Sequence, residues 1–339
     1  MRSKQGGEVG YGARVRRVLT SVLIVVLGLA QVAACSGGGD PGIAESTATA
    51  EQSGPRRPGV TPEVRDLTAY AGLGTWVDAY DYSPAFVDKG QPAVTPASVA
   101  DMAAVGVDTL YLQAAKDDER SPGMLVDAKL VGRFLVRAHA RGMRVVAWFL
   151  PKLADIEADA KRLEHLLEYE IDGQRFDGVA VDIEWVDSVP DTATRNRRVV
   201  ALSERVDMLA AGDPLGAIVL PPVATEVINP LLWPAFPYRK LAPYFGVWMT
   251  MGYWTFRSEE SGYRDAARYT DENIRRLRAN LGDSNVPVHP IGGIGDKSTR
   301  SDYEGFVAAA REQRAVGWSV YDFVTTSSAA WPALRRPRA

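Results

Sequence analysis

Eight short apolar runs recur along the chain from about residue 72 onward, and a helical pattern follows most of them. Such runs predict strands buried on both faces, which are typical of parallel sheets covered by helices. Eight strand–helix units in a stretch near the usual 250 residues indicate an α/β fold, a (β/α)8 TIM barrel, as a single domain at residues 71–334. The predicted strands cover residues 74–80, 109–114, 144–150, 175–186, 217–220, 245–253, 286–294 and 316–323, and the predicted helices cover 95–105, 126–141, 156–170, 192–211, 271–281 and 301–314.

A doubly wound open sheet is the alternative within the α/β class. That fold often carries a glycine-rich phosphate-binding turn after its first strand. Residues 78–83 follow the first predicted strand here and read D-A-Y-D-Y-S, without a glycine. The run G-G-I-G at 292–295 comes late in the chain and lacks the rest of the pattern. The barrel is therefore preferred.

The fourth predicted strand carries two acids on one face. Asp182 and Glu184 are two residues apart, a spacing that places both side chains on the same side of a strand, about 6.6 Å apart. Val179, Val181 and Ile183 alternate with these positions and face the other side. Because buried carboxylates are costly, this pair at the C-terminal end of a strand indicates a functional site at the mouth of the barrel.

Polar and aromatic residues gather at the C-terminal ends of the other predicted strands, where barrel active sites lie. Carboxylates interleaved with Trp and Tyr suit a carbohydrate, because sugar rings stack on aromatic faces while sugar hydroxyls bond acids. A phosphorylated ligand fits poorly, since no cluster of Lys or Arg is predicted there. The candidates are Asp78, Asp81, Gln113, Trp148, Asp182, Glu184, Trp185, Glu226, Tyr253, Trp254, Asp296, Trp318, Tyr321 and Asp322.

Three segments carry a family resemblance. Residues 177–184 read D-G-V-A-V-D-I-E, which resembles the D-G-x-D-x-D-x-E motif on strand four of the family 18 glycoside hydrolases, the chitinase-like barrels. Residues 251–253 read M-G-Y and resemble the family's M-x-Y motif on strand six. Trp318 stands on strand eight, where those enzymes place a floor tryptophan.

The resemblance implies specific roles at the matching positions. Glu184 would protonate the glycosidic oxygen, and Asp182 would orient the substrate's N-acetyl group, which acts as the nucleophile. Tyr253 would bond the reacting sugar, and Trp318 would stack beneath it. The remaining expected substrate-binding residues are Asp78, Gln113, Trp148, Trp185 and Asp322.

The sequence departs from the family pattern at two places. Ala180 replaces the middle Asp of the strand-four motif, and strand three lacks the S-x-G-G pattern. These departures are compatible with an altered substrate or a lost activity, so a non-catalytic sugar-binding barrel remains an alternative function. A lysozyme-like enzyme that pairs Glu184 with Asp78 or Asp81 also stays open. A barrel whose mouth is filled by the proline-rich insertion at residues 229–244 would instead be a scaffold without a ligand.

The N-terminus has the pattern of an exported lipoprotein. A basic segment with Arg14, Arg16 and Arg17 precedes an apolar run at residues 18–30, which is too short for a membrane-spanning helix. V-A-A-C at residues 32–35 then resembles the lipobox of bacterial lipoproteins, whose cysteine is lipidated. We expect a signal peptide at 1–34, lipidated Cys35 with a flexible linker at 35–70, and attachment to the outer face of the cell membrane. Residues 335–339 are expected to be a basic tail.

The remaining features exclude several classes of protein. The net charge of −3 and the short basic runs give no sign of nucleic-acid binding. His139, His165 and His289 have no second ligand at metal-binding spacing, so neither a metal nor another cofactor is predicted. Ser203 and Ser319 have no His partner within a recognisable motif, which disfavours a serine hydrolase. The sequence leaves the oligomeric state open.

Overall fold

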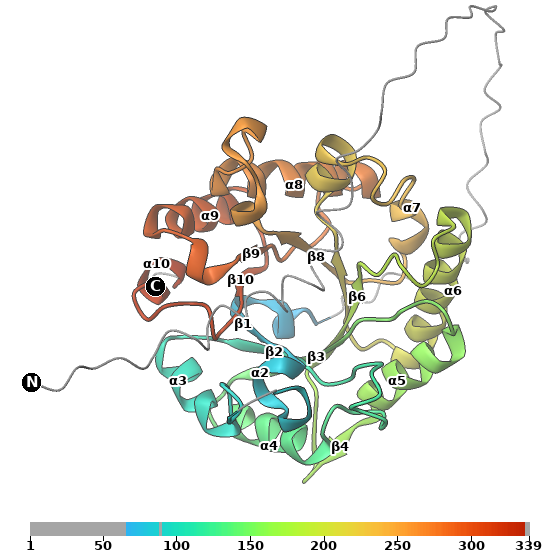
Figure 1. Ribbon diagram of the computed structural model, residues 1–339, viewed down its shortest axis with the longest axis vertical. Coiled ribbons are helices and arrows are strands. Elements are labelled where there is room, and N and C mark those ends of the chain that lie inside the picture. The colour runs from blue at the N-terminus through green and yellow to red at the C-terminus, as the bar shows by residue number, and fades with distance from the viewer. Residues whose placement is uncertain (1–65, 88–89, 336–339) are drawn as a thin grey trace, which may run out of the picture. The chain divides into compact units, whose positions relative to one another are not determined.

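The structure, a computed structural model, describes residues 66–87 and 90–335. Eight parallel strands close into a barrel in the order β1-β10-β9-β8-β7-β6-β3-β2, with helices forming an outer ring (Figure 1). The predicted (β/α)8 barrel is therefore confirmed. The strands are β1 (Gly72–Val77), β2 (Thr109–Gln113), β3 (Arg144–Phe149), β6 (Gly178–Ile183), β7 (Leu215–Val219), β8 (Val247–Gly252), β9 (Ile291–Gly293) and β10 (Gly317–Tyr321).

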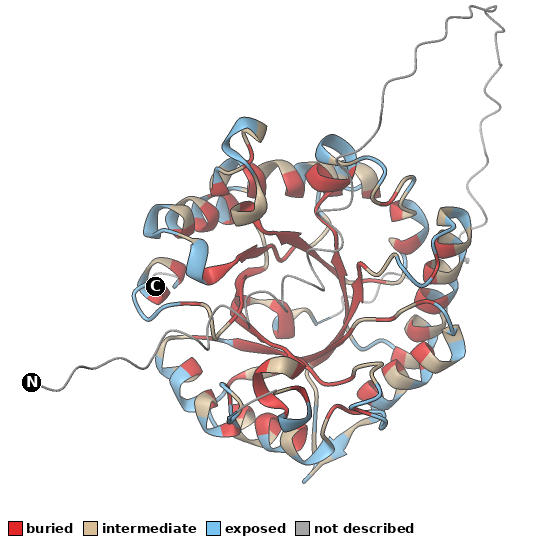
Figure 2. Ribbon diagram, viewed as in Figure 1, coloured by how far each residue is buried: buried red, intermediate tan, exposed pale blue. Residues whose placement is uncertain are grey.

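The longer helices begin where an Asp or Thr side chain accepts a hydrogen bond from a backbone N–H of the first turn. Their inward faces are buried against the strands, which are themselves buried along almost their whole length (Figure 2). The α-helices are α2 (Ala79–Tyr82), α3 (Val99–Ala104), α4 (Ala128–His139), α5 (Ile156–Glu168), α6 (Thr192–Ala210), α7 (Tyr238–Leu241), α8 (Ala266–Leu281), α9 (Arg300–Glu312) and α10 (Trp331–Leu334).

Tyr70 packs against the N-terminal ends of barrel strands. It ends a short helical turn, Thr68–Tyr70, and its hydroxyl lies within hydrogen-bond distance of the carbonyl oxygens of Val179 (2.9 Å) and Pro214 (3.0 Å). A Cβ on Gly178 or Gly216 would lie 2.9 Å from atoms of the Tyr70 side chain, so these two positions need glycine. The barrel fold thus starts a few residues earlier than residue 71.

The C-terminal boundary also differs from the prediction. Arg335 is joined to the fold, because its guanidinium donates hydrogen bonds to the carbonyls of Ala104 (3.0 Å) and Val105 (2.6 Å) at the C-terminal end of α3. Arg335, the first residue of the predicted basic tail, thus contacts the barrel, and residues 336–339 lie outside the described residues.

A buried chain of hydrogen bonds links the lower part of the barrel to the mouth. His289 Nδ1 lies 2.8 Å from the carbonyl oxygen of Tyr70, so this nitrogen must carry the proton. His289 Nε2 then accepts from the Ser319 hydroxyl (3.0 Å), whose oxygen accepts from Trp76 Nε1–H (2.8 Å). Both Ser319 and His289 are 0% exposed, so this Ser–His pair is part of the core and meets no substrate.

Three predicted boundaries are wrong because local hydrogen bonding ends or starts an element elsewhere. Arg175 belongs to a hairpin of β4 (Glu170–Ile171) and β5 (Gln174–Arg175), which separates α5 from β6. The helix predicted to start at residue 271 begins at Ala266 because Asp265 caps it. The helix predicted to start at Ser301 begins at Arg300, capped by Thr299.

The insertion at residues 229–244 packs on the outside of the barrel. Trp233 Nε1 donates a hydrogen bond to Asn196 on α6 (2.7 Å), and its ring lies beneath the guanidinium of Arg195 at 4.5 Å. Tyr238 packs against Trp248, with ring centroids 6.2 Å apart. The insertion is anchored to the surrounding helices, which disfavours the scaffold with a filled mouth.

The predicted signal peptide, Cys35 and most of the predicted linker lie outside the described residues. In the described part of the chain, no helix has the length and hydrophobicity needed to cross a membrane.

Candidate active site

Four aromatic side chains from the first three strands and the last strand of the barrel meet in its interior. Trp76 on β1 stacks on Tyr111 of β2, with centroids 4.5 Å apart and an angle of 13° between the rings. The edge of Trp148 on β3 lies 5.8 Å from Trp76, and Tyr321 on β10 lies 6.4 Å from it. The contact between Trp76 and Trp148 joins β1 and β3, which are not neighbouring strands, and this places the rings inside the barrel. Trp76 was not among the predicted site residues, although it is two residues before Asp78 and shares its strand face.

Asp182 and Glu184 follow the predicted alternation and are both buried, at 6% and 7% exposure. Burial, and then the charge of Glu184, raises the pKa of Asp182 well above its usual range. Burial also raises the pKa of Glu184 to about 7, against the opposing charge of Lys116. Repulsion between the acids alone would give a smaller shift, so desolvation is the main cause. A carboxyl with this pKa can both donate and accept a proton near neutral pH.

Lys116 is a second residue that the sequence analysis missed. It follows β2 by three residues, and its Nζ lies 4.9 Å from the ring centroid of Tyr80. Its charge lowers the pKa values of both Asp182 and Glu184. Its position just beyond a strand end is the sequence signal that could have identified it.

Tyr253, at the end of β8, is close to the acids of both sides of the mouth. Burial raises the pKa of its phenol, and the charges of Glu184, Asp182, Asp322 and Asp78 raise it further, in that order. Its ring lies 5.8 Å from that of Tyr321. The three residues expected to be catalytic therefore lie close together: the charges of Glu184 and Asp182 act on the phenol of Tyr253.

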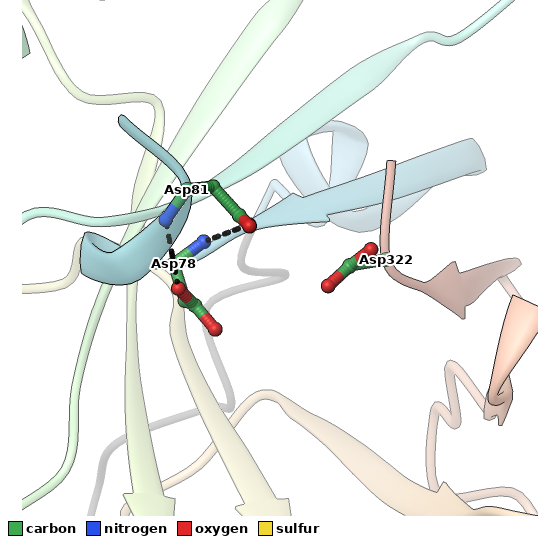
Figure 3. Close-up of side chains that lie close together, drawn as sticks. All are labelled: Asp78, Asp81 and Asp322. Carbon is green, nitrogen blue, oxygen red and sulfur yellow. Dashed lines mark hydrogen bonds between the residues drawn. The ribbon is translucent and has the colours of Figure 1, made fainter. Parts of the chain in front are cut away.

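A second group of acids lies on the side of the barrel formed by β1 and β10. Asp78, Asp81 and Asp322 each place one carboxylate oxygen within 4.8 Å of the others (Figure 3). Asp78 Oδ1 accepts from the N–H groups of Tyr80 (2.7 Å) and Asp81 (3.2 Å), and so caps α2. Asp81 Oδ2 accepts from Asp78 N–H (3.2 Å).

The carboxyls of Asp78 and Asp322 have different hydrogen-bond donors. Asp78 Oδ2 accepts a 2.6 Å hydrogen bond from the Tyr321 hydroxyl. Asp322 Oδ1 accepts a 2.8 Å hydrogen bond from Thr325 N–H. Burial and the charge of Asp78 raise the pKa of Asp322 to about 7. Although a cation could bridge three oxygens at this spacing, the Asp78 oxygens already have protein donors.

The placement of Trp318 contradicts the prediction. Its Nε1 donates a 2.8 Å hydrogen bond to the carbonyl of Leu334, and Arg311 of α9 lies 5.4 Å from its ring. Trp318 therefore faces the outer helices, because strand parity gives the interior positions of β10 to its neighbours Ser319 and Tyr321. It cannot be a floor on which a sugar stacks.

The other predicted binding residues, Gln113 and Trp185, form hydrogen bonds with different parts of the protein. Gln113 Oε1 accepts a hydrogen bond from Ala79 N–H (3.0 Å), so this side chain supports α2 at the mouth. Trp185 lies beyond the end of β6, half-buried, and its Nε1 donates to Ser188 Oγ (2.8 Å). Of the wider candidate set, Glu226 is paired with Arg276 (3.0 Å) and Asp296 is exposed. Neither is among the groups that raise the pKa of Tyr253.

These features define a (β/α)8 barrel with a mouth lined by acids and aromatic rings. Solved structures of chitinases and other glycoside hydrolases share its fold. They include a class V chitinase from Pseudomonas fluorescens (TM-score 0.55, 11% identity, covering 78% of this chain and 98% of that chain). An endo-1,4-beta-D-mannanase from Thermotoga petrophila has a TM-score of 0.55 at 10% identity and covers 74% of this chain and 88% of its own.

The glycoside hydrolase domain of PgaB (BpsB) from Bordetella bronchiseptica is also similar, with a TM-score of 0.53 at 11% identity, over 79% of this chain and 99% of its own. None of the family models and none of the curated protein sequences matches the chain. At these identities the likeness is one of fold.

Proposed function

We propose that this protein is a membrane-anchored, extracytoplasmic glycoside hydrolase that acts on a polysaccharide or cell-wall glycan. The observation that carries the proposal is that buried Glu184, Asp182 and Tyr253 lie at the C-terminal ends of β6 and β8, where the charges of the two acids act on Tyr253. Glu184 is suited to the general acid because its pKa of about 7 keeps a proton available near neutral pH. The nearby aromatic side chains suit a sugar.

The proposed reaction follows from these groups. Glu184 gives its proton to the glycosidic oxygen as the bond from that oxygen to the anomeric carbon breaks. Asp182 orients the N-acetyl group, whose carbonyl oxygen bonds to the anomeric carbon. Water then replaces the carbonyl oxygen and loses its proton to Glu184, which restores the resting enzyme.

The decisive experiment compares hydrolysis and binding in the full-length protein purified in detergent. A panel of N-acetylated and plain glycans, including peptidoglycan fragments, is assayed with the wild type and with Glu184→Gln. We expect the variant to lose hydrolysis by at least a hundredfold while it still binds the glycan. Equal turnover by both proteins would remove Glu184 from the acid role. Binding without turnover by the wild type would support the alternative, a non-catalytic sugar-binding barrel.

A lysozyme-like, two-carboxylate reaction is the second candidate, and the arrangement of the acids favours Asp322 over the predicted Asp78 and Asp81 as its second group. Both oxygens of Asp78 already accept hydrogen bonds, one from the first turn of α2 and the other from Tyr321, whereas Asp322 accepts one from Thr325 N–H through Oδ1. β10 and β6 are on opposite sides of the closed strand order, so a sugar would lie between Asp322 and Glu184. Asp322→Asn should abolish turnover in this candidate, whereas Asp182→Asn should do so in the first.

The membrane attachment is tested separately, through Cys35. Cells that express the wild type or Cys35→Ser are fed a labelled fatty acid and then fractionated. We expect the label and the membrane location in the wild type only. Membrane retention of an unlabelled wild type would contradict lipidation at Cys35.

A further inference from the structure

Among the buried polar atoms without a hydrogen-bond partner in the described residues, two lie on neighbouring strands at the inner wall of the barrel: Trp148 Nε1, a donor, and Asp182 Oδ1, an acceptor. Their side chains are only 5% and 6% exposed. An unsatisfied buried polar atom costs about 1–3 kcal/mol, and such atoms are rare in folded proteins. A donor and an acceptor left unpaired on the inner wall are groups that a bound ligand can satisfy.

The two atoms come from neighbouring strands and the same face. In the pairing of β3 with β6, Trp148 lies directly beside Ala180, and Asp182 is the next inward-facing residue of β6 toward the mouth. Neighbouring strands are about 4.8 Å apart and residues two apart on a strand about 6.6 Å, so the two positions are about 8 Å apart, within the span of one sugar ring and its substituents. The short Ala180 side chain leaves room for the indole, which extends toward Trp76 at 5.8 Å.

We propose that Trp148 Nε1–H and Asp182 Oδ1 together bind one polar substituent of the sugar ring, a hydroxyl or a secondary amide. The indole donates to the substituent's oxygen, and Asp182 accepts its O–H or N–H. Trp148 is then a specificity-determining residue for the glycan. This inference rests on the proposed function for the position of the sugar, and it adds the group that the site recognises.

The chemistry of the pair limits the ligand. An anionic substituent, such as a carboxylate or a phosphate, can accept from Trp148 Nε1–H but has no hydrogen to donate to Asp182 Oδ1, so this atom would stay unpaired. An apolar substituent would leave both polar atoms unpaired and so keep their cost. Neutral groups that donate and accept at once satisfy both atoms.

The test uses Trp148→Phe, which keeps an aromatic ring and removes the N–H. Trp254→Phe is a matched control, because Trp254 Nε1 is also buried and unpartnered among the described residues, yet its ring lies against Phe306 of α9 at 5.2 Å. Chitotriose and cellotriose serve as probes of an amide and a hydroxyl. Binding is measured in the Glu184→Gln background, so that the glycan is not consumed.

We expect one of the two trisaccharides, or both, to shift the indole N–H resonance of Trp148 in a ¹H–¹⁵N spectrum. Trp148→Phe should weaken that binding about tenfold, the effect of one hydrogen bond worth about 1.4 kcal/mol. Trp254→Phe should bind within about twofold of its parent. The trisaccharide that shows the effect identifies the substituent.

Three results would overturn the inference: an unmoved Trp148 resonance at saturating glycan, equal weakening by the two Trp variants, or failure of both trisaccharides to bind. The resonance is read in a protein with Trp148 intact, so it decides the matter even where Trp148→Phe folds poorly. A shifted resonance without hydrolysis by the wild type would refute the proposed enzyme and keep this subsite. Hydrolysis by the wild type together with an unmoved Trp148 resonance would refute this subsite and keep the proposed enzyme.

Discussion

The hydroxyl of Tyr321 donates a 2.6 Å hydrogen bond to Asp78 Oδ2, and this bond joins the last strand of the barrel to the residue that follows the first. Both side chains are buried, at 9% and 4% exposure. The same Asp78 carboxylate caps α2 through its other oxygen. One contact therefore holds a strand end, a short helix and the mouth of the barrel together.

Tyr321→Phe should destabilise the protein by about 1–3 kcal/mol, because it leaves a buried Asp78 oxygen without its donor. Urea unfolding measures this loss. Tyr169→Phe is the control, since the hydrogen bond of Tyr169 to the Ala128 carbonyl (3.0 Å) is at the surface and should be worth less. Equal effects of the two variants would show that the Tyr321–Asp78 bond has no special role.

Turnover should fall as the pH rises above about 7. The proposed general acid, Glu184, acts in its protonated form, and burial raises its pKa to about 7, so the protonated fraction declines through that pH. A profile of kcat against pH measures the alkaline limb. A rate that stays constant from pH 6 to 9 would contradict the assignment.

Glu184→Gln should make the fold more stable at pH 8 even as it removes activity. The folded-state pKa of Glu184, about 7, is above its ordinary value of 4.5, so above pH 7 the fold holds a buried carboxylate at a cost on the order of 3 kcal/mol. The neutral amide removes that cost. As the pH falls through 7 toward 4.5, the wild type gains a proton on folding and the difference should shrink to near zero. Thermal unfolding at pH 5 and pH 8 gives the comparison, and a stability gap that does not change with pH would contradict it.

His139→Gln should destabilise the protein by about 1 kcal/mol at pH 6 and by less at pH 9. The Asp177 carboxylate, 2.9 Å from His139 Nε2, raises the pKa of His139 above 6.5. The stabilisation is therefore complete below 6.5 and is lost as the pH rises through the folded-state pKa. His165→Gln, at an exposed position on α5, is the control and should change stability little at either pH. A loss that grows with pH would contradict the role of this ion pair.

Strand parity explains both the correct and the incorrect predictions at the site. Asp182 and Glu184 were placed on the same inner face because their spacing within one strand leaves no alternative. Trp318 was assigned to the floor from its family position, and its outward orientation follows from the register of β10 against β1 and β9. A register shift of one residue moves every side chain of a strand to the other face. When a strand is apolar and buried on both faces, its sequence therefore does not reveal which aromatic side chain points into the barrel.

The sequence by itself determined the barrel and its acidic strand, because alternating strands and helices and a two-residue repeat are local properties of the chain. Tertiary structure alone decided the rest: that Trp76 and Trp148 face the interior, that Tyr321 holds Asp78, and that His289 bonds Ser319. These partners are far apart in sequence, and their meeting depends on how the strands are staggered when the barrel closes. The pKa values of Glu184 and Asp322 likewise come from burial, which is set by all the strands together.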